Sequence, residues 1–243
     1  MLFEVFVNAF LEGSRFFLPG NRSRVRVTNE IILDLYLTYW NDRSNLLTMK
    51  RIHNKDDIVQ AGLDIILSKG FNATGVEAIL KQANVPKGSF YNFFSSKEDF
   101  GLAIIDRYSA EINEVLHPIY HDESSPPLER IKKGFETLIA RFEGNDCAKG
   151  CLIGNLSLEM SDQYENVRHR LEQSLRGWSD VLTNLLHEAR KDNAILSEVD
   201  PEILAENLIS SFQGALLRSK VKKSSGPLNN FIHLYFDKFL PLK

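Results

Sequence analysis

Residues 71–100, FNATGVEAILKQANVPKGSFYNFFSSKEDF, contain the pattern that decides the fold. Thr74 precedes a helical run and Glu77 follows three residues later, which is the spacing of a capping box, so a helix is expected from about Gly75. Its apolar residues recur at three- and four-residue spacing and predict one face that packs on a core: Val76, Ile79, Leu80 and Ala83. Pro86 then interrupts the pattern, because proline disfavours helical geometry in the residue before it.

A second helix is expected from Lys87, because proline is well suited to the position that opens a helix. Phe90 and Phe94 are four residues apart and should point inward together. The outward side then carries a cation, two hydroxyls and an amide, from Lys87, Ser89, Tyr91 and Asn92. Such groups suit phosphate oxygens and base edges, so the pattern predicts a helix-turn-helix that reads DNA.

A third helix should begin at once, because Ser96 with Asp99, or Ser95 with Glu98, is a further capping signal. Lys97 lies in its first turn, where helix-end N–H groups favour an anion such as a DNA phosphate. The alternative is an ordinary helical hairpin whose polar face is merely solvated.

The same residues resemble the DNA-binding domain of the TetR family of transcriptional regulators, and the run VPKGSFYNFFSSKE is its most specific part. The resemblance covers about residues 52–112 strongly and the remainder weakly. It implies an all-α fold: a three-helix DNA-binding domain at 52–112, with the helix-turn-helix at 75–94, and a helical effector-binding and dimerisation domain at 113–243. The DNA contacts that it implies are Thr74, Lys87, Gly88, Ser89, Tyr91, Asn92 and Lys97.

The composition is that of a globular protein, with 243 residues, 43% hydrophobic and 25% charged. The net charge of −3 does not favour nucleic acid, so DNA affinity must come from local placement. A basic arm before the first helix fits backbone contact: Lys50, Arg51, His53 and Lys55. Two cysteines cannot form a disulfide framework, which indicates a reducing, cytoplasmic setting. No apolar run reaches membrane-spanning length.

Residues 1–51 differ from the remainder and are interpreted as an N-terminal extension. Residues 1–20 are rich in aromatic side chains but lack the early positive charge of a secretory signal. Met49 directly precedes the basic arm, so translation is expected to begin there. The alternative is a genuine extra helix or a partner-binding segment.

The rest of the chain predicts helices only, and Pro118 with the polar run at 122–127 should end the long helix that follows Ser96. The expected helices span 55–69, 75–83, 87–94, 96–116, 128–142, 151–160, 163–191, 201–217 and 228–240. Two apolar stripes are expected to form a four-helix dimer interface or an internal core: Leu204, Leu208, Phe212, Ala215 and Leu216, and Phe231, Leu234, Tyr235 and Phe239.

Signals for enzymes, cofactors and metals are weak. The glycines form no phosphate-binding loop, and no Cys-x-x-Cys pair is present. His117 and His121 lie on either side of Pro118. This favours a solvated helix end over a metal site. The chain is therefore not expected to be an enzyme or to hold a cofactor.

Residues 149–162, KGCLIGNLSLEMSD, resemble the TetR subgroup that includes the N-ethylmaleimide reductase repressor. That resemblance implies that Cys151 senses a reactive electrophile. A cation such as Lys220 would assist it, because a thiol reacts as thiolate. The alternative is that Cys151 is a small core residue.

The sequence thus predicts a homodimeric regulator of a palindromic operator on double-stranded DNA, acting as a repressor that a small molecule releases. A reactive electrophile is one candidate for that molecule. The rival interpretations are a helical small-molecule-binding protein or enzyme without DNA binding, and a helical scaffold that binds protein.

Overall fold

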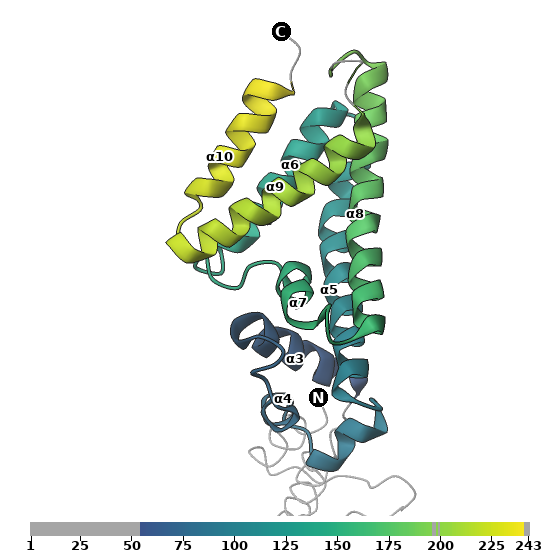
Figure 1. Ribbon diagram of the computed structural model, residues 1–243, viewed down its shortest axis with the longest axis vertical. Helices are drawn as coiled ribbons and strands as arrows, with labels where there is room; N and C mark the ends of the chain where they lie inside the picture. The colour runs from purple at the N-terminus through teal and green to yellow at the C-terminus, as the bar shows by residue number, and fades with distance from the viewer. Residues whose placement is uncertain (1–53, 196–197, 199, 241–243) are drawn as a thin grey trace, which may run out of the picture. The chain divides into compact units, whose positions relative to one another are not determined.

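The computed structural model describes residues 54–195, 198 and 200–240, and all regular structure in this part of the chain is helical (Figure 1). The predicted all-α class is confirmed. Three predictions concern residues that lie outside the described part of the chain. They are the N-terminal extension, the start of translation at Met49, and the basic-arm residues Lys50, Arg51 and His53. None of the described helices combines the length and apolar character that a membrane crossing requires.

The helices follow the predicted order with small shifts at their ends. They are α3 (Lys55–Lys69), α4 (Val76–Ala83), the 3-10 helix η1 (Lys87–Asn92), α5 (Lys97–Tyr120), α6 (Pro127–Glu143), α7 (Leu152–Met160), α8 (Glu165–Lys191), α9 (Pro201–Lys222), α10 (Gly226–Leu234) and the π-helix η2 (Tyr235–Phe239). Two predicted N-caps are confirmed: Ser96 accepts a hydrogen bond from the Asp99 amide at 3.0 Å, and Asp200 accepts one from Glu202 at 2.9 Å.

Two predicted helix boundaries are wrong in their details. The Thr74 hydroxyl donates to the Gly70 carbonyl at 2.6 Å instead of capping α4, whose N-cap is Gly75. The helix α5 continues through Pro118 to Tyr120. Arg130 of α6 supports this end, because its Nη1 donates to the Tyr120 carbonyl at 2.9 Å and satisfies a group that lacks a partner within the helix.

The long helices α5 and α8 run beside each other, and α6, α9 and α10 pack around their upper half (Figure 1). An aromatic cluster joins α6 to α9, α10 and η2: Phe135, Phe212, Phe231 and Phe236, with ring centroids 5.0–6.2 Å apart. At the other end, α3, α4 and η1 pack on the first turns of α5.

The two apolar stripes expected at a dimer interface lie largely inside this chain. Their members Leu208, Phe212, Leu216 and Phe231 are buried, so the internal-core alternative is correct for these four. Two members of the second stripe are exposed as predicted, Leu234 of α10 and Phe239 of η2. On α9 the exposed large apolar side chains are not members of the predicted stripe: Ile203, Leu217 and Val221. The unpartnered apolar face therefore lies on the side of α9 opposite to the one predicted.

Candidate functional site

A buried phenylalanine cluster fixes the predicted DNA-reading segment. Phe90, Phe94 and Phe100 are each 0–1% exposed, and their ring centroids lie 5.0–5.4 Å apart. A Cβ on Gly62 of α3 would lie 2.2 Å from Cζ of Phe100, so α3 approaches this cluster closely. The cluster therefore packs η1 against both α5 and α3.

Most of the predicted DNA contacts lie along η1, away from that core. Tyr91 is 67% exposed, Gly88 and Asn92 are exposed and Ser89 is half-buried. Lys87 is the first residue of η1. The turn before it depends on Asn84, which ends α4 in the left-handed region with φ 56°.

Two predicted DNA contacts, Thr74 and Lys97, make hydrogen bonds within the chain in this structure. Thr74 is 1% exposed, and its hydroxyl is used by Gly70. The Lys97 ammonium donates to the Phe71 carbonyl at 2.7 Å and lies 4.4 Å from the centroid of that ring. Burial lowers the pKa of Lys97, while the nearby Glu159 carboxylate acts in the opposite direction. Both side chains stabilise the loop between α3 and α4.

The end of α7 is attached to the same loop. The Asn72 amide donates to Oε2 of Glu159 at 3.0 Å, and Nδ2 of Asn72 donates to the Glu159 carbonyl at 3.3 Å. Gly70 has φ 88°, and a Cβ there would lie 2.8 Å from Oε1 of Glu159, so the close approach requires glycine. No spacing in the sequence indicates this contact, because Asn72 and Glu159 are 87 positions apart.

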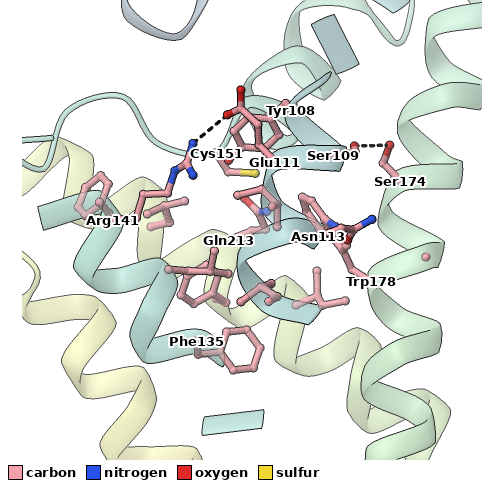
Figure 2. A pocket seen from close by; sticks show the side chains of 18 of the residues that line it. Tyr108, Ser109, Glu111, Asn113, Phe135, Arg141, Cys151, Ser174, Trp178 and Gln213 are labelled. Atoms are coloured by element: carbon pink, nitrogen blue, oxygen red, sulfur yellow. Dashed lines mark hydrogen bonds and ion pairs between the residues drawn. The ribbon is translucent and has the colours of Figure 1, made fainter. Parts of the chain in front are cut away.

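A cavity of about 800 Å³ lies among α3, α5, α6, α8 and α9 (Figure 2). Most of its wall is apolar, including Leu116, Phe135, Leu138, Trp178, Leu182, Ile209 and Phe212. Polar side chains supply the remainder of the wall, among them Tyr108, Glu111, Arg141, Lys149 and Gln213. A cavity whose surface is mainly apolar and which also presents polar groups is typical of a small-molecule site.

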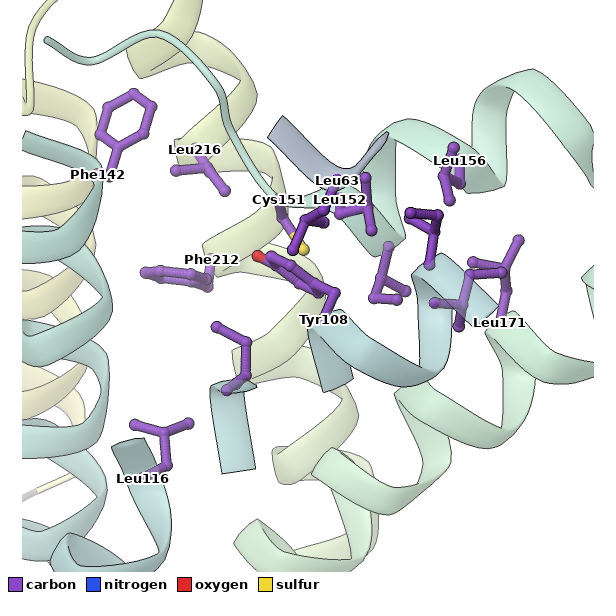
Figure 3. Packing of buried hydrophobic residues seen from close by; sticks show 14 of the residues in the cluster. Leu63, Tyr108, Leu116, Phe142, Cys151, Leu152, Leu156, Leu171, Phe212 and Leu216 are labelled. Atoms are coloured by element: carbon purple, nitrogen blue, oxygen red, sulfur yellow. The ribbon is translucent and has the colours of Figure 1, made fainter. Parts of the chain in front are cut away.

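Cys151 lines this cavity as the N-cap residue of α7 and is 8% exposed. The Tyr108 side chain lies beside its sulfur (Figure 3). Burial raises the pKa of Tyr108 well above its usual value, and the charge and hydrogen bond of Cys151 add to this effect. Lys220 packs beside the thiol's neighbour, because its Cδ lies 3.6 Å from where a Cβ on Gly150 would be.

Sequence reasoning missed Tyr108 and Arg141. Both line the cavity from other helices, Tyr108 from α5 and Arg141 from α6. The charge of Arg141 acts on the Tyr108 hydroxyl, which places a guanidinium, a phenol and a thiol at one end of the cavity (Figure 2).

The two histidines near Pro118 stack on each other. The rings of His117 and His121 stack with centroids 4.0 Å apart and planes 16° from parallel. Within the described residues, no group of three or more His, Cys, Asp or Glu side chains could hold a metal ion.

Two family models match the chain. The model for bacterial regulatory proteins of the tetR family matches residues 58–104, and that for a tetracyclin repressor-like C-terminal domain matches residues 127–235. The transcriptional repressor DhaR of Mycobacterium sp. (strain GP1) is 33% identical over 79% of this chain and 96% of its own length.

Similar proteins of known structure agree with these matches. The repressor NemR of Escherichia coli is 30% identical over 72% of this chain and 88% of its own length. Its reduced form superposes with a TM-score of 0.69, covering 75% of this chain and 94% of that one. A TetR regulatory protein of Rhodobacter sphaeroides is 35% identical, with a TM-score of 0.69, and the match covers 72% of this chain and 93% of that chain.

These findings confirm the predicted resemblance, including that to the subgroup with the N-ethylmaleimide reductase repressor. The relatives are transcriptional regulators and not enzymes. The helix-turn-helix built on Phe90, Phe94 and Phe100 lies within the first matched region, and most of the cavity-lining residues lie within the second. The chain belongs to the TetR family of DNA-binding transcriptional regulators.

Proposed function

We propose that this regulator is a homodimeric repressor that binds a palindromic operator through η1 and is released by a small molecule in the cavity. The observation that carries the proposal is that α7 has its N-cap, Cys151, at the cavity and contacts the loop between α3 and α4 through Glu159 near its other end. An effector that favours a different placement of α7 would shift the population of DNA-binding conformers. The DNA-binding domain is assigned to about residues 52–112 and the effector domain to 113–243, and binding to chromosomal DNA implies a cytoplasmic location.

The test of DNA binding is fluorescence anisotropy with labelled DNA from upstream of the chain's own gene, at several salt concentrations. Tyr91→Ala is expected to weaken binding to all sequences, because a phosphate contact carries no sequence information. Asn92→Ala or Ser89→Ala should instead relax sequence preference. For Asn92→Ala, the ratio of affinities for operators with the correct and the wrong base should fall by about 5- to 100-fold.

Lys97→Gln should leave the salt slope unchanged, because its ammonium is bound to Phe71. The matched control is Arg176→Ala on α8, whose guanidinium is 70% exposed and pairs with Glu172. If Tyr91→Ala and Asn92→Ala bind like the parent, η1 does not read DNA.

The dimer is assigned to the exposed apolar face of α9 and α10, with two helices from each subunit forming a four-helix interface. Leu217→Glu combined with Val221→Glu is expected to give monomers at micromolar concentration and to lose operator binding, because charges on this face cannot be buried unpaired. Sedimentation velocity measures the change. Leu158→Glu, which alters an 84% exposed leucine on α7, should remain dimeric; a dimeric double variant would reject the assignment.

A further inference from the structure

We propose that the cavity takes an effector with an apolar body and one carboxylate group, and that Arg141 binds the carboxylate. The inference rests on the proposed function only in treating the cavity as the effector site. It adds the chemical class of the ligand and the residue that recognises it.

The charge balance beside the cavity leaves Arg141 as the surplus cation. Nη2 of Arg141 lies 3.2 Å from Oε2 of Glu111, while Nε of Arg107 lies 3.0 Å from the other oxygen, Oε1. One carboxylate therefore faces two guanidinium groups. If Arg141 turns to a ligand, Glu111 keeps Arg107 as a partner and is not left as an unpaired charge. Arg141 is also 41% exposed, which gives it room to move.

A cationic ligand would find no equivalent partner. The carboxylates among the described lining residues are Asp64 and Glu111, and each already has a cation near it. Lys149 lies 4.0 Å from Asp64, so that pair adds no net charge. A single surplus guanidinium matches a monoanion, and its planar donors fit a carboxylate in two-point contact. A phosphate dianion would remain half neutralised.

The rest of the cavity requires an apolar body. Its volume of about 800 Å³ is in the range of sites for drug-sized ligands, so a molecule of three or four carbon atoms would leave most of it unfilled. Arg141, Tyr108 and Cys151 lie at one end in Figure 2, and Phe135 lies at the opposite end. Tyr108 provides a neutral hydroxyl beside the head group. A bound molecule would thus place its carboxylate near the start of α7 and its body among the aromatic side chains.

The test compares three ten-carbon probes, decanoate, decanol and decylamine, by calorimetric titration of the full-length chain without DNA. Decanoate is expected to bind about 10- to 100-fold more tightly than decanol, because hydrogen bonds to a charged group are stronger than neutral ones. Decylamine should bind more weakly than either. Arg141→Met keeps the aliphatic stem and should remove the preference for decanoate.

Two further variants test whether the charge beside the cavity controls decanoate binding. Glu111→Gln removes the competing carboxylate and should tighten decanoate binding several-fold. Arg176→Met, which alters a guanidinium outside the cavity, should bind all probes like the parent. Thermal unfolding of each variant verifies that it is folded.

Equal binding of decanoate and decanol, undiminished decanoate binding by Arg141→Met, or no binding of decanoate up to millimolar concentration would each overturn the inference. Because no DNA is present, these results are independent of operator binding. A chain that fails to bind DNA but prefers decanoate would contradict the proposed function alone.

Discussion

Phe90→Ala is expected to lower the free energy of unfolding by about 3–5 kcal/mol, the range for truncating a buried aromatic side chain. Phe90 is fully buried and contacts the rings of Phe94 and Phe100. Phe90 holds η1 on the core, and η1 is a 3-10 helix of only six residues. Since whole domains have only about 5–15 kcal/mol of stability, the variant should also lose operator binding. Urea denaturation followed by circular dichroism measures the first effect, and anisotropy measures the second.

The adjacent residue provides the matched control. Tyr91→Ala removes an aromatic ring of similar size that is 67% exposed, so its unfolding free energy should change by about 0.5 kcal/mol or less. Both variants are expected to weaken DNA binding. Phe90→Ala should do so by destabilising the fold, and Tyr91→Ala by removing a contact with DNA. Parental stability in Phe90→Ala would show that the phenylalanine cluster does not anchor η1.

The local features of the fold were predictable because their signals lie within a few residues of one another. The Ser96 and Asp200 caps depend on backbone N–H groups two or three positions away. The inward placement of Phe90 and Phe94 follows from a four-residue spacing. In each case the interacting residues are as close in the sequence as the pattern that predicts them.

The errors arise where two local arrangements compete. A threonine hydroxyl can cap the next helix or bond back to a carbonyl, and Thr74 bonds to Gly70. Pro118 was expected to stop α5, but proline in a last turn removes only one internal hydrogen bond, and Arg130 stabilises the end from another helix. The choice depends on neighbours that sequence patterns do not specify.

The candidate site was predictable only in part, because it depends on long-range contacts. Cys151 was identified, but Tyr108 beside it comes from α5, 43 positions earlier, and Arg141, which acts on Tyr108, comes from α6. The contact of Glu159 with Asn72 spans 87 positions and carries no periodic signal. Packing of whole helices creates these contacts, and single-residue spacing does not reveal them.

Those contacts place one end of α7 at the cavity and the other end at the DNA-binding domain. The helix is nine residues long, or about 13 Å at 1.5 Å per residue. Cys151 caps its start, and Met160 at its end lies 3.3 Å from where a Cβ on Gly101 would be, beside Phe71. Because the interior is closely packed, added bulk at one end is expected to shift the whole helix.

We propose that Cys151 is the residue that reacts with an electrophilic effector. Cys151→Ser is therefore expected to weaken the release from DNA by such a compound at least about tenfold. In the reaction with an α,β-unsaturated aldehyde, a bond forms between Sγ and the β-carbon, and the thiol proton ends on the α-carbon. The attacking species is the thiolate, because a thiol reacts as its anion.

Operator release is followed by anisotropy during titration with acrolein, and intact mass reports the adduct. The parent should be released and carry one adduct, whereas Cys151→Ser should need at least about tenfold more aldehyde, because the nucleophile of the buried site is gone. Cys147→Ser, which alters the half-buried second cysteine, is the control and should behave like the parent. Normal release of Cys151→Ser would return Cys151 to the role of a core residue beside a non-covalent pocket, with effector control through the cavity and Arg141 alone.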